Sequence, residues 1–338
     1  MTDIKKNRKT TIYDLAQLTG ISASAVSAIL NGSWKKRRIS PGRAEQVMRI
    51  AEQQGYTVNR QASLLRSRKS GVIGMIVPKY DNRYFGAIVE KFEAMARARG
   101  LFPFVTCTSR DPDLELEAAR NMLSWQVDWV IATGATQPDK ITQLCVQAGV
   151  RSLNLDLPGT LAPSVISDNY AGAKALTSRI LDNVMRHKGS ALPLVFIGGR
   201  GSDYNTRERL RGFLDAHSDY RVAVPDACLL PCGYASEKAE TALADFCSGP
   251  ENQLNGLFVN STISLEGVLR ELSRNRTTAQ PLPPLGCFDW DPFVTLLNRN
   301  IDMVKQDVPK MLEAAFTLID MDNTTPEIVQ IPPLHVKA

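Results

Sequence analysis

The first sixty residues carry apolar side chains at helical spacing. A first helix is predicted over residues 10–18, with Thr10 or Thr11 as its N-cap, because four apolar residues would lie largely on one helical face: Ile12, Leu15, Ala16 and Leu18. Gly20 ends this helix. Ser22 is the N-cap of a second helix, which closes at Asn31-Gly32 and has the apolar stripe Val26, Ile29 and Leu30. Two short helices joined by a tight turn are therefore expected.

The distances along these two helices are informative. Four residues separate Ala16 from Gly20, six more lead to Val26, and three more to Ile29. Two helices that cross steeply need a small residue at the crossing, a residue tolerant of positive φ in the turn, and apolar anchors on the second helix. The spacing therefore predicts a helix-turn-helix. Ser40, Pro41 and Gly55 mark the ends of a third helix that shares its core.

From residue 71 onward, short apolar runs alternate with amphipathic stretches. The apolar runs predict strands at 72–77, 102–106, 129–132, 152–155, 194–197, 227–230, 256–259 and 285–288. The amphipathic stretches predict helices at 84–99, 114–125, 171–186, 207–216, 236–246, 264–274 and 308–319. Strands that alternate with helices form parallel sheets covered on both faces. We therefore expect an α/β region built from two such sheets.

Ligands of open parallel sheets bind beyond the carboxyl ends of the strands. The loops at those ends are rich in aromatic, amide and charged residues, and they lie at 79–85, 167–169, 198–203, 260–262 and 288–290. Flat rings can cover the apolar face of a sugar while carboxylates and amides bond its hydroxyls. The glycines at 198–201 lack the spacing of a phosphate-binding or dinucleotide-binding loop. A sugar-like ligand is favoured.

Composition is that of an ordinary globular protein, with 338 residues, 43% hydrophobic and 22% charged. The apolar runs are far shorter than the roughly 18 to 20 residues that span a bilayer, and no export signal opens the chain, so a soluble cytoplasmic protein without membrane contact is expected. Six scattered cysteines and three histidines complete no metal-ligand pattern. We expect no metal and no cofactor. An enzyme of sugar metabolism with an accessory basic domain remains the alternative.

The net charge of +5 is unevenly distributed. Residues 1–70 hold fourteen Lys or Arg against four acids, a net charge of +10, and the other 268 residues have a net charge of −5. A solvated basic tail would have this charge but no apolar periodicity and no helix caps. The basic segment is instead interpreted as a folded module that contacts double-stranded DNA.

Two segments of the sequence resemble a known protein family. Residues 11–32 (TIYDLAQLTGISASAVSAILNG) followed by residues 55–66 (GYTVNRQASLLR) are similar to the head and hinge of the lactose-repressor (LacI/GalR) family, and the likeness extends over essentially the whole chain. Within the family, the basic stretch between Gly32 and Ser40 most resembles the fructose repressors. The resemblance implies a non-enzymatic transcriptional regulator, in most cases a repressor, controlled by a small sugar-like effector.

The resemblance also implies an architecture. A small all-α helix-turn-helix DNA-binding head would occupy residues 1–58, and a hinge helix and linker would occupy 59–70. An α/β sensor domain similar to periplasmic binding proteins, with two parallel-sheet subdomains, would occupy 71–338. Because an operator read by two heads is a pseudo-palindrome, a homodimer through the sensor is expected. The segment 334–338 contains no heptads, so a coiled-coil tetramer is not expected.

In such a head the second helix lies in the major groove. The DNA contacts that the resemblance implies are Thr11, Tyr13, Ser22, Ala23, Ser24, Ser27 and Asn31. This chain departs from the family pattern, because Ala23 and Ser24 are small and Ala28 stands where an arginine is usual. Small residues make no bidentate base contact, which is worth about 1–3 kcal/mol of discrimination. Part of the specificity is therefore assigned to the basic segment beside Trp34, namely Lys35, Lys36, Arg37 and Arg38; its alternative is a solvated loop.

The hinge and the effector site follow from the same likeness. In the hinge, Asn59 and Arg60 would contact DNA, Ala62 would lie at the minor groove, and Leu65 would be the apolar wedge that bends the duplex; a core contact is the alternative for Leu65.

The effector contacts would be Asn82, Arg83, Phe85, Asp168, Arg200, Arg209, Ser261 and Asp289. Ser261-Thr262 stands where the family usually has Asn-Asp.

The cations near the expected cleft bear on the chemistry of the effector. Lys79, Arg83, Arg200 and Arg209 all fall in or near the loops at the strand ends. Four such cations favour an anionic effector, a sugar phosphate or sugar acid. The alternative is that three of the four face solvent.

Overall fold

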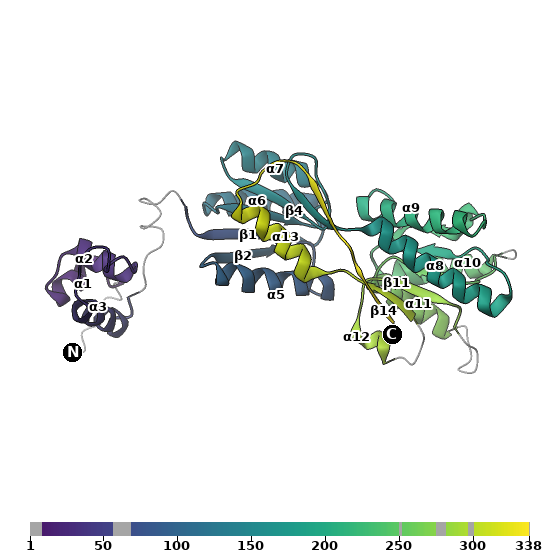
Figure 1. The fold of residues 1–338 in the computed structure, drawn as a ribbon, viewed down its shortest axis with the longest axis horizontal. Coiled ribbons are helices and arrows are strands. Elements are labelled where there is room, and N and C mark those ends of the chain that lie inside the picture. Colours follow the sequence, from purple (N-terminus) through teal and green to yellow (C-terminus); the bar gives the residue numbers. More distant parts are fainter. Residues whose placement is uncertain (1–8, 57–68, 250–251, 275–281, 297–300, 338) are drawn as a thin grey trace, which may run out of the picture. The chain divides into compact units, whose positions relative to one another are not determined.

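The computed structural model describes residues 9–56, 69–249, 252–274, 282–296 and 301–337. The chain divides into two compact units, residues 1–70 and residues 71–338, which are called the head and the sensor below. Figure 1 shows the helices of the head and the two layered halves of the sensor. Within the described residues, no helix combines the length and apolarity that a membrane span requires.

The described residues of the head form a bundle of three short helices, α1 (Ile12–Thr19), α2 (Ala23–Leu30) and α3 (Pro41–Gln53). The caps expected for α1 and for the start of α2 are present, whereas Ser40 precedes α3 without a side-chain capping hydrogen bond. The Thr11 side chain accepts a hydrogen bond from the backbone N–H of Asp14, and the Asp14 carboxylate accepts one from the backbone N–H of Thr11, a reciprocal capping box. Gly20 ends α1 in the left-handed region, at φ 69°. This turn directs α2 away from α1.

A single small core holds the head together. Six side chains are buried in it: Leu15, Val26, Ile29, Ala44, Val47 and Ala51. All three helices contribute to this cluster, so none can bury its apolar face alone. Trp34 and Tyr56, which lie outside the helices, pack on its margin.

The sensor contains two six-stranded sheets. The strands of the first, in spatial order, are β13 (Ile328–Ile331), β5 (Ser164–Ser167), β4 (Arg151–Leu155), β3 (Trp129–Thr133), β1 (Val72–Val77) and β2 (Phe102–Cys107). All neighbouring pairs of this sheet are parallel. It is covered by α5 (Arg83–Ala98), α6 (Pro112–Ser124), α7 (Pro138–Gln147) and α13 (Val308–Asp320). These elements form the first subdomain.

The second subdomain repeats this layered plan. Its strands, in spatial order, are β14 (Leu334–Lys337), β12 (Ile301–Lys305), β11 (Leu285–Phe288), β10 (Leu257–Val259), β6 (Val195–Ile197) and β8 (Leu229–Leu230). Only the edge pair β12–β14 is antiparallel among these described strands. The sheet is covered by α8 (Asn169–Lys188), α9 (Tyr204–Asp219), α10 (Ser236–Ser248) and α11 (Thr262–Arg274). Smaller elements are β7 (Gly199–Arg200), which pairs with β9 (Cys232–Gly233), the 3₁₀ turn η1 (Asp226–Cys228) and α12 (Pro292–Thr295).

The chain passes between the subdomains three times. The passages lie between β5 and α8, between β12 and α13, and between β13 and β14, and Figure 1 shows the strands meeting there at the centre of the sensor. Each passage is one or two residues long. Because the first two passages leave the carboxyl ends of strands in the two sheets, the loops of both sheets meet at the same place. This topology positions the ligand site.

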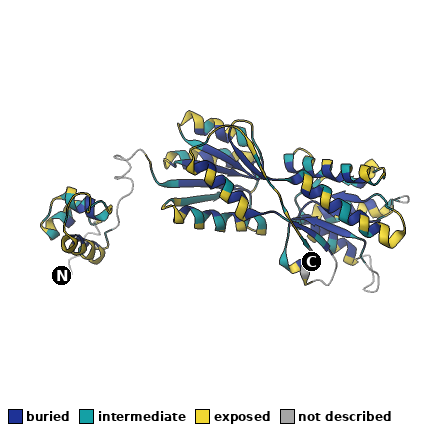
Figure 2. Ribbon diagram, in the orientation of Figure 1, coloured by how far each residue is buried: buried dark blue, intermediate teal, exposed yellow. Residues whose placement is uncertain are grey.

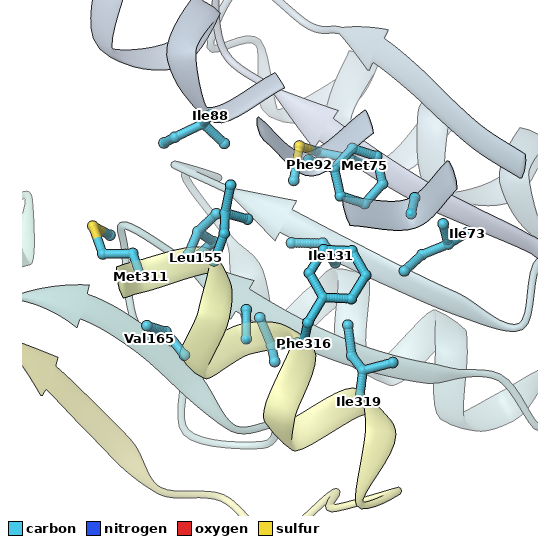
Figure 3. Close-up of a cluster of buried hydrophobic side chains, with 14 of the residues drawn as sticks. Ile73, Met75, Ile88, Phe92, Ile131, Leu155, Val165, Met311, Phe316 and Ile319 are labelled. Carbon is cyan, nitrogen blue, oxygen red and sulfur yellow. The ribbon is translucent and has the colours of Figure 1, made fainter. Parts of the chain in front are cut away.

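Burial follows the layers. The sheets are buried and the outer helix faces exposed, as Figure 2 shows. In the first subdomain, side chains of α13 and α5 pack on the face of the sheet that carries Ile73, Met75 and Ile131 (Figure 3). Phe92 of α5 and Phe316 of α13 stack with their ring centroids 6.0 Å apart. α13 is therefore part of the first subdomain, although it follows the second in sequence.

The parallel-sheet architecture predicted from the apolar pattern is confirmed. All eight predicted strands and seven predicted helices of the sensor are present, with ends shifted by a few residues. The prediction missed α7, β5 and β12–β14 among the larger elements. β5 is only four residues long and contains two serines, and β13 is half-exposed, so neither has a continuous apolar run.

Candidate functional site

The N-terminal end of α2 exposes small polar side chains. Ser22 and Ser24 are exposed, and their hydroxyl oxygens lie 3.0 Å apart. Ser22 also caps α2 by accepting from the backbone N–H of Ala25, and the side-chain amide of Asn31 donates to the hydroxyl of Ser27. Ala23 is half-buried beside them. Such an end can meet base edges through hydroxyls and a methyl group.

Other predicted DNA contacts in the head are also accessible. Tyr13 is 75% exposed on α1, although Thr11 is partly committed to its capping box. Ala28, in contrast, is buried in the head.

The basic segment lies between α2 and α3. Its four cations, Lys35, Lys36, Arg37 and Arg38, are exposed, while Trp34 is half-buried against the core of the head. The ammonium of Lys35 lies 5.5 Å from the centroid of the Trp34 ring. The tryptophan therefore anchors a connection whose charges face solvent, the arrangement that a phosphate contact needs. The hinge residues Asn59, Arg60, Ala62 and Leu65 lie outside the described residues.

The sensor encloses a polar cavity of about 380 Å³, including its open mouth, where the strand ends of the two sheets meet. Its lining is Asn82, Tyr84, Phe85, Arg110, Asp156, Leu157, Asp203, Asn205, Arg209, Tyr234, Ser261, Asp289 and Gln306. Five predicted effector contacts line it: Asn82, Phe85, Arg209, Ser261 and Asp289.

Arg209 is the most constrained charge of the cavity. It is 3% exposed, and its guanidinium lies 3.7 Å from the centroid of the Phe288 ring. Its Nε donates to the side-chain oxygen of Asn169 at 2.8 Å, and Nη1 donates to the backbone carbonyl of Asn260 at 2.7 Å. No carboxylate pairs with it within 4.0 Å among the described residues. The guanidinium of Arg209 is thus held in place by neutral groups, and its charge is available to a ligand in the cavity.

Two carboxylates face this arginine from opposite subdomains. Asp156 follows β4 and accepts from the Tyr84 hydroxyl at 3.0 Å and from the Asn205 amide at 3.2 Å. Asp289 follows β11 and accepts from the Gln306 amide at 2.6 Å. Burial raises the pKa of both, that of Asp289 to about 6, while Arg209 acts in the opposite direction. Both can accept hydrogen bonds from ligand hydroxyls.

Backbone conformation also distinguishes this site. Eight non-glycine residues among those described have positive φ, and three of them line the cavity: Arg110 at 61°, Asp156 at 74° and Asp289 at 100°. A left-handed conformation costs a non-glycine residue of order 1–3 kcal/mol and persists where the surrounding structure fixes it, commonly in ligand sites. The lining residues are thus held in place by their surroundings.

Three predicted effector contacts lie elsewhere. Arg83 forms an ion pair with Asp291 at 2.9 Å and stacks over Phe293 at 5.0 Å. Asp168 caps α8 by accepting from the backbone N–H of Ala171. Arg200 is in the short β7–β9 pair and is not part of the cavity wall. Ser261, which does line the cavity, is bonded to Ser264 at the start of α11, where its hydroxyl accepts from a backbone N–H.

The sequence reasoning missed several lining residues. Asp156 and Arg110 each follow a predicted strand within four residues, so the rule that led to the other loops would have found them. Asp203 and Tyr84 were inside the loops that the sequence selected. Gln306 follows β12, a strand that the sequence did not predict. Within the described residues no cluster of three or more His, Cys, Asp or Glu could hold a metal ion.

Comparisons with known proteins identify the family. A model of the periplasmic binding proteins and sugar-binding domain of the LacI family matches residues 70–279, more than half of the chain. The chain is a member of the LacI family. The family resemblance is thereby confirmed, and so is the prediction of a transcriptional regulator, because relatives of this LacI-family chain include operon repressors.

Two relatives show how the similarity is distributed. The ribitol operon repressor of Klebsiella aerogenes is 72% identical over 193 residues, which are 57% of this chain and 72% of the relative. The sucrose operon repressor of Klebsiella pneumoniae is 27% identical over 328 residues, 96% of each chain. The LacI-family likeness therefore includes both the head and the sensor.

A solved structure has the same fold. The lac repressor dimer bound to operator and the anti-inducer ONPF superposes with a TM-score of 0.82 over 98% of both chains, at 18% identity. At this identity the similarity establishes the fold, a helical head followed by two parallel-sheet subdomains. The fold class expected from the sequence is thus confirmed.

Proposed function

We propose that this LacI-family regulator is a homodimeric repressor of an operon for a pentitol of the ribitol class, and that the pentitol itself occupies the sensor cavity. The observation that carries the proposal is the charge of the cavity. Asp156, Asp203 and Asp289 line it together with two arginines, Arg110 and Arg209. A set with more carboxylates than cations disfavours a phosphate and suits a neutral polyol, whose hydroxyls both donate and accept.

This replaces the anionic effector that the sequence favoured. Of the four cations behind that expectation, Arg209 alone is in the cavity wall, whereas Lys79 and Arg83 have the ion-pair partners Asp81 and Asp291. The name of the 72% identical relative, a ribitol operon repressor, supports a five-carbon polyol independently. We assign the hydroxyl contacts to Asp156, Arg209 and Asp289, with Asn82, Phe85 and Ser261 completing the wall.

The DNA contacts are proposed from exposure and family membership. Tyr13, Ser22, Ala23, Ser24 and Ser27 would face the major groove, with Thr11 and Asn31 at its edges, and the cations of 35–38 would meet phosphates. Asn59, Arg60, Ala62 and Leu65 of the hinge would contact the minor groove. Because the proposed ligand of the head is operator DNA, we propose that the chain acts in the cytoplasm, as a regulator and not as an enzyme.

The test uses the full chain and a duplex selected from a random pool. Affinity for the selected duplex is measured with and without ribitol, with mannitol and ribose 5-phosphate as competing candidates. A selected inverted repeat whose affinity changes with ribitol at lower concentrations than with the other two supports the proposal. If no inverted repeat is selected, the proposed binding of a homodimer to an operator is wrong. If ribose 5-phosphate alone changes the DNA affinity, the effector is not a polyol, and the anionic effector expected from the sequence is supported instead.

The basic segment can be tested separately on the same duplex. Lys36→Ala and Arg37→Ala each remove one exposed cation from the connection between α2 and α3. If that cation contacts a phosphate, the dependence of log affinity on log salt becomes shallower by about 1 for each change. Arg49→Ala removes an exposed cation from α3 and is the control. If the slope of log affinity against log salt is the same for all three variants and the unchanged chain, the segment is a solvated loop that makes no phosphate contact.

A further inference from the structure

Arg110 occupies an unusual position in the cavity wall. It follows β2, and both Ser109 and Arg110 have positive φ, 53° and 61°. Its guanidinium lies over two aromatic rings, 5.5 Å from the centroid of Phe85 and 4.6 Å from that of Tyr234. Phe85 belongs to α5 of the first subdomain and Tyr234 precedes α10 of the second. One planar cation therefore lies over one aromatic ring from each subdomain.

The donors of Arg110 differ from those of Arg209. Two donors of Arg209 are used by Asn169 and the carbonyl of Asn260. Arg110, in contrast, has no hydrogen bond or ion pair within the described part of the chain. It lies over the two rings, and it attracts the carboxylates of Asp156, Asp203 and Asp289 only through electrostatic interaction. A guanidinium carries five N–H donors in a plane. These donors are available to oxygen atoms of a ligand in the same cavity.

Cation–π contact and sugar stacking compete for the same ring faces. A cyclic sugar binds by laying its apolar face on an aromatic ring while its hydroxyls bond polar groups at the edge. Here the guanidinium already lies over the rings of Phe85 and Tyr234. A sugar ring would have to displace it. An open-chain polyol has no flat face to stack, so it loses nothing by this arrangement and gains hydrogen-bond donors.

We propose that Arg110 selects the effector by shape: it covers Phe85 and Tyr234 against cyclic sugars and donates hydrogen bonds to the hydroxyls of an open-chain polyol. The inference rests on the proposed function, since it names the residue that makes the same cavity specific for a polyol. Arg110 is not among the effector contacts predicted from the sequence. We assign to it the discrimination between an open-chain and a cyclic five-carbon ligand.

The experiment compares two probes that cannot interconvert, ribitol and methyl β-D-ribopyranoside, by calorimetry with the full chain. The unchanged protein should bind ribitol and exclude the glycoside. Arg110→Ala should bind ribitol about tenfold or more weakly, because hydrogen bonds from a charged donor are lost, and should bind the glycoside more tightly through the exposed rings. Arg110→Lys keeps the charge but lacks the planar fork, so it should discriminate less than arginine does.

Arg120→Ala is the matched control, because Arg120 is an exposed arginine on α6 of the same subdomain and is not part of the cavity. It should leave both affinities unchanged. Thermal unfolding of each variant verifies that it folds, and Arg110→Lys provides the comparison if Arg110→Ala does not.

Three outcomes would overturn the inference. Ribitol binding with an unchanged ratio of affinities in Arg110→Ala leaves the proposed function standing and removes the role of Arg110. Tighter binding of ribitol 5-phosphate than of ribitol by the unchanged protein, lost in Arg110→Ala, would make Arg110 a phosphate contact. Failure of the unchanged protein to bind any of these compounds refutes the proposed function itself, and the inference with it.

Discussion

The head and the sensor place their charges in opposite ways. In the head, Lys35, Lys36, Arg37 and Arg38 are all exposed on one connection. In the sensor cavity, Arg209 is 3% exposed and Asp289 is 8% exposed. Exposed cations attract a polyanion over long distances and are screened by salt, whereas buried charges are desolvated and act on what touches them. The two regions are therefore suited to different ligands, a long charged duplex and a small neutral molecule.

The largest effect that this comparison predicts is on DNA affinity. Raising salt from about 50 to about 200 mM should weaken binding to the selected duplex by roughly 10³-fold, because each phosphate contact releases counterions. Ribitol affinity, measured by calorimetry over the same salt range, should change by less than about twofold. An equally steep salt dependence of ribitol binding would show that the cavity charges are not shielded from solvent.

The second prediction concerns the core of the sensor. Phe213 of α9 is fully buried and packs edge-on against Phe196 and Phe258, with centroids 5.5 and 5.7 Å away. Phe213→Ala should lower the free energy of unfolding of the sensor by about 3–5 kcal/mol. Chemical denaturation monitored by circular dichroism measures it, with Leu214→Ala, at a 37% exposed position, as control. A loss below 1 kcal/mol would mean that this core repacks.

The third prediction concerns the truncation of a buried side chain in the head. Leu15→Ala removes a fully buried side chain from a core of only six, and should cost about 2–5 kcal/mol. A domain of this size is marginally stable, so the head should unfold while the sensor stays folded. DNA binding should disappear and ribitol binding should persist. Leu18→Ala, at a 54% exposed position on α1, should retain both. Loss of ribitol binding in Leu15→Ala would refute independent folding of the two units.

The fourth prediction is a pH dependence confined to the cavity. Burial raises the pKa of Asp289 from 3.8 to about 6. Its carboxylate form, which accepts hydrogen bonds, is present above this pKa and is lost as the pH falls through it. Ribitol affinity should therefore decrease below pH 6, by up to about tenfold per pH unit. Calorimetry between pH 5 and pH 8 measures it. Asp289→Asn, which cannot ionise, should bind weakly but with a flatter profile, and an unaltered profile would assign the titration to another group.

The smallest effect is expected at the exposed ion pair between the subdomains. Arg83 of α5 joins Asp291 ahead of α12, and the side chains are 53% and 23% exposed. Removing such a pair by Arg83→Ala should change sensor stability by only about 0.2–1 kcal/mol. Arg97→Ala, which breaks an exposed pair within α5, is the control. A tenfold loss of ribitol affinity in Arg83→Ala would instead restore Arg83 to the effector site predicted from the sequence.

The local signals were sufficient for the head. Thr11, Gly20 and Ser22 were predicted as helix ends from residue type alone, and the structure places each at a helix end. Caps and turns act over three or four residues, so the information is contiguous in the sequence. The hinge contacts at 59–65 stay a prediction.

The cavity was predictable only in part. Asn82, Phe85, Arg209, Ser261 and Asp289 were found because they lie in the loops at strand ends or match the family motif. Arg83 and Phe85 are two residues apart in one helical turn, yet only Phe85 lines the cavity while Arg83 pairs with Asp291. Sequence position cannot decide between these directions, because Asp291, the partner of Arg83, comes from the other subdomain.

The sequence by itself determined the three short helices and the basic charge of the head, together with most of the strands and helices of the sensor, because each depends on neighbouring residues. The tertiary structure decided which charges are buried together. Asp156, Arg209 and Asp289 are separated by tens of residues, and they meet only because the chain passes three times between the two sheets. Desolvation at that meeting point, which no single segment has alone, turns ordinary surface residue types into a binding site for a small ligand.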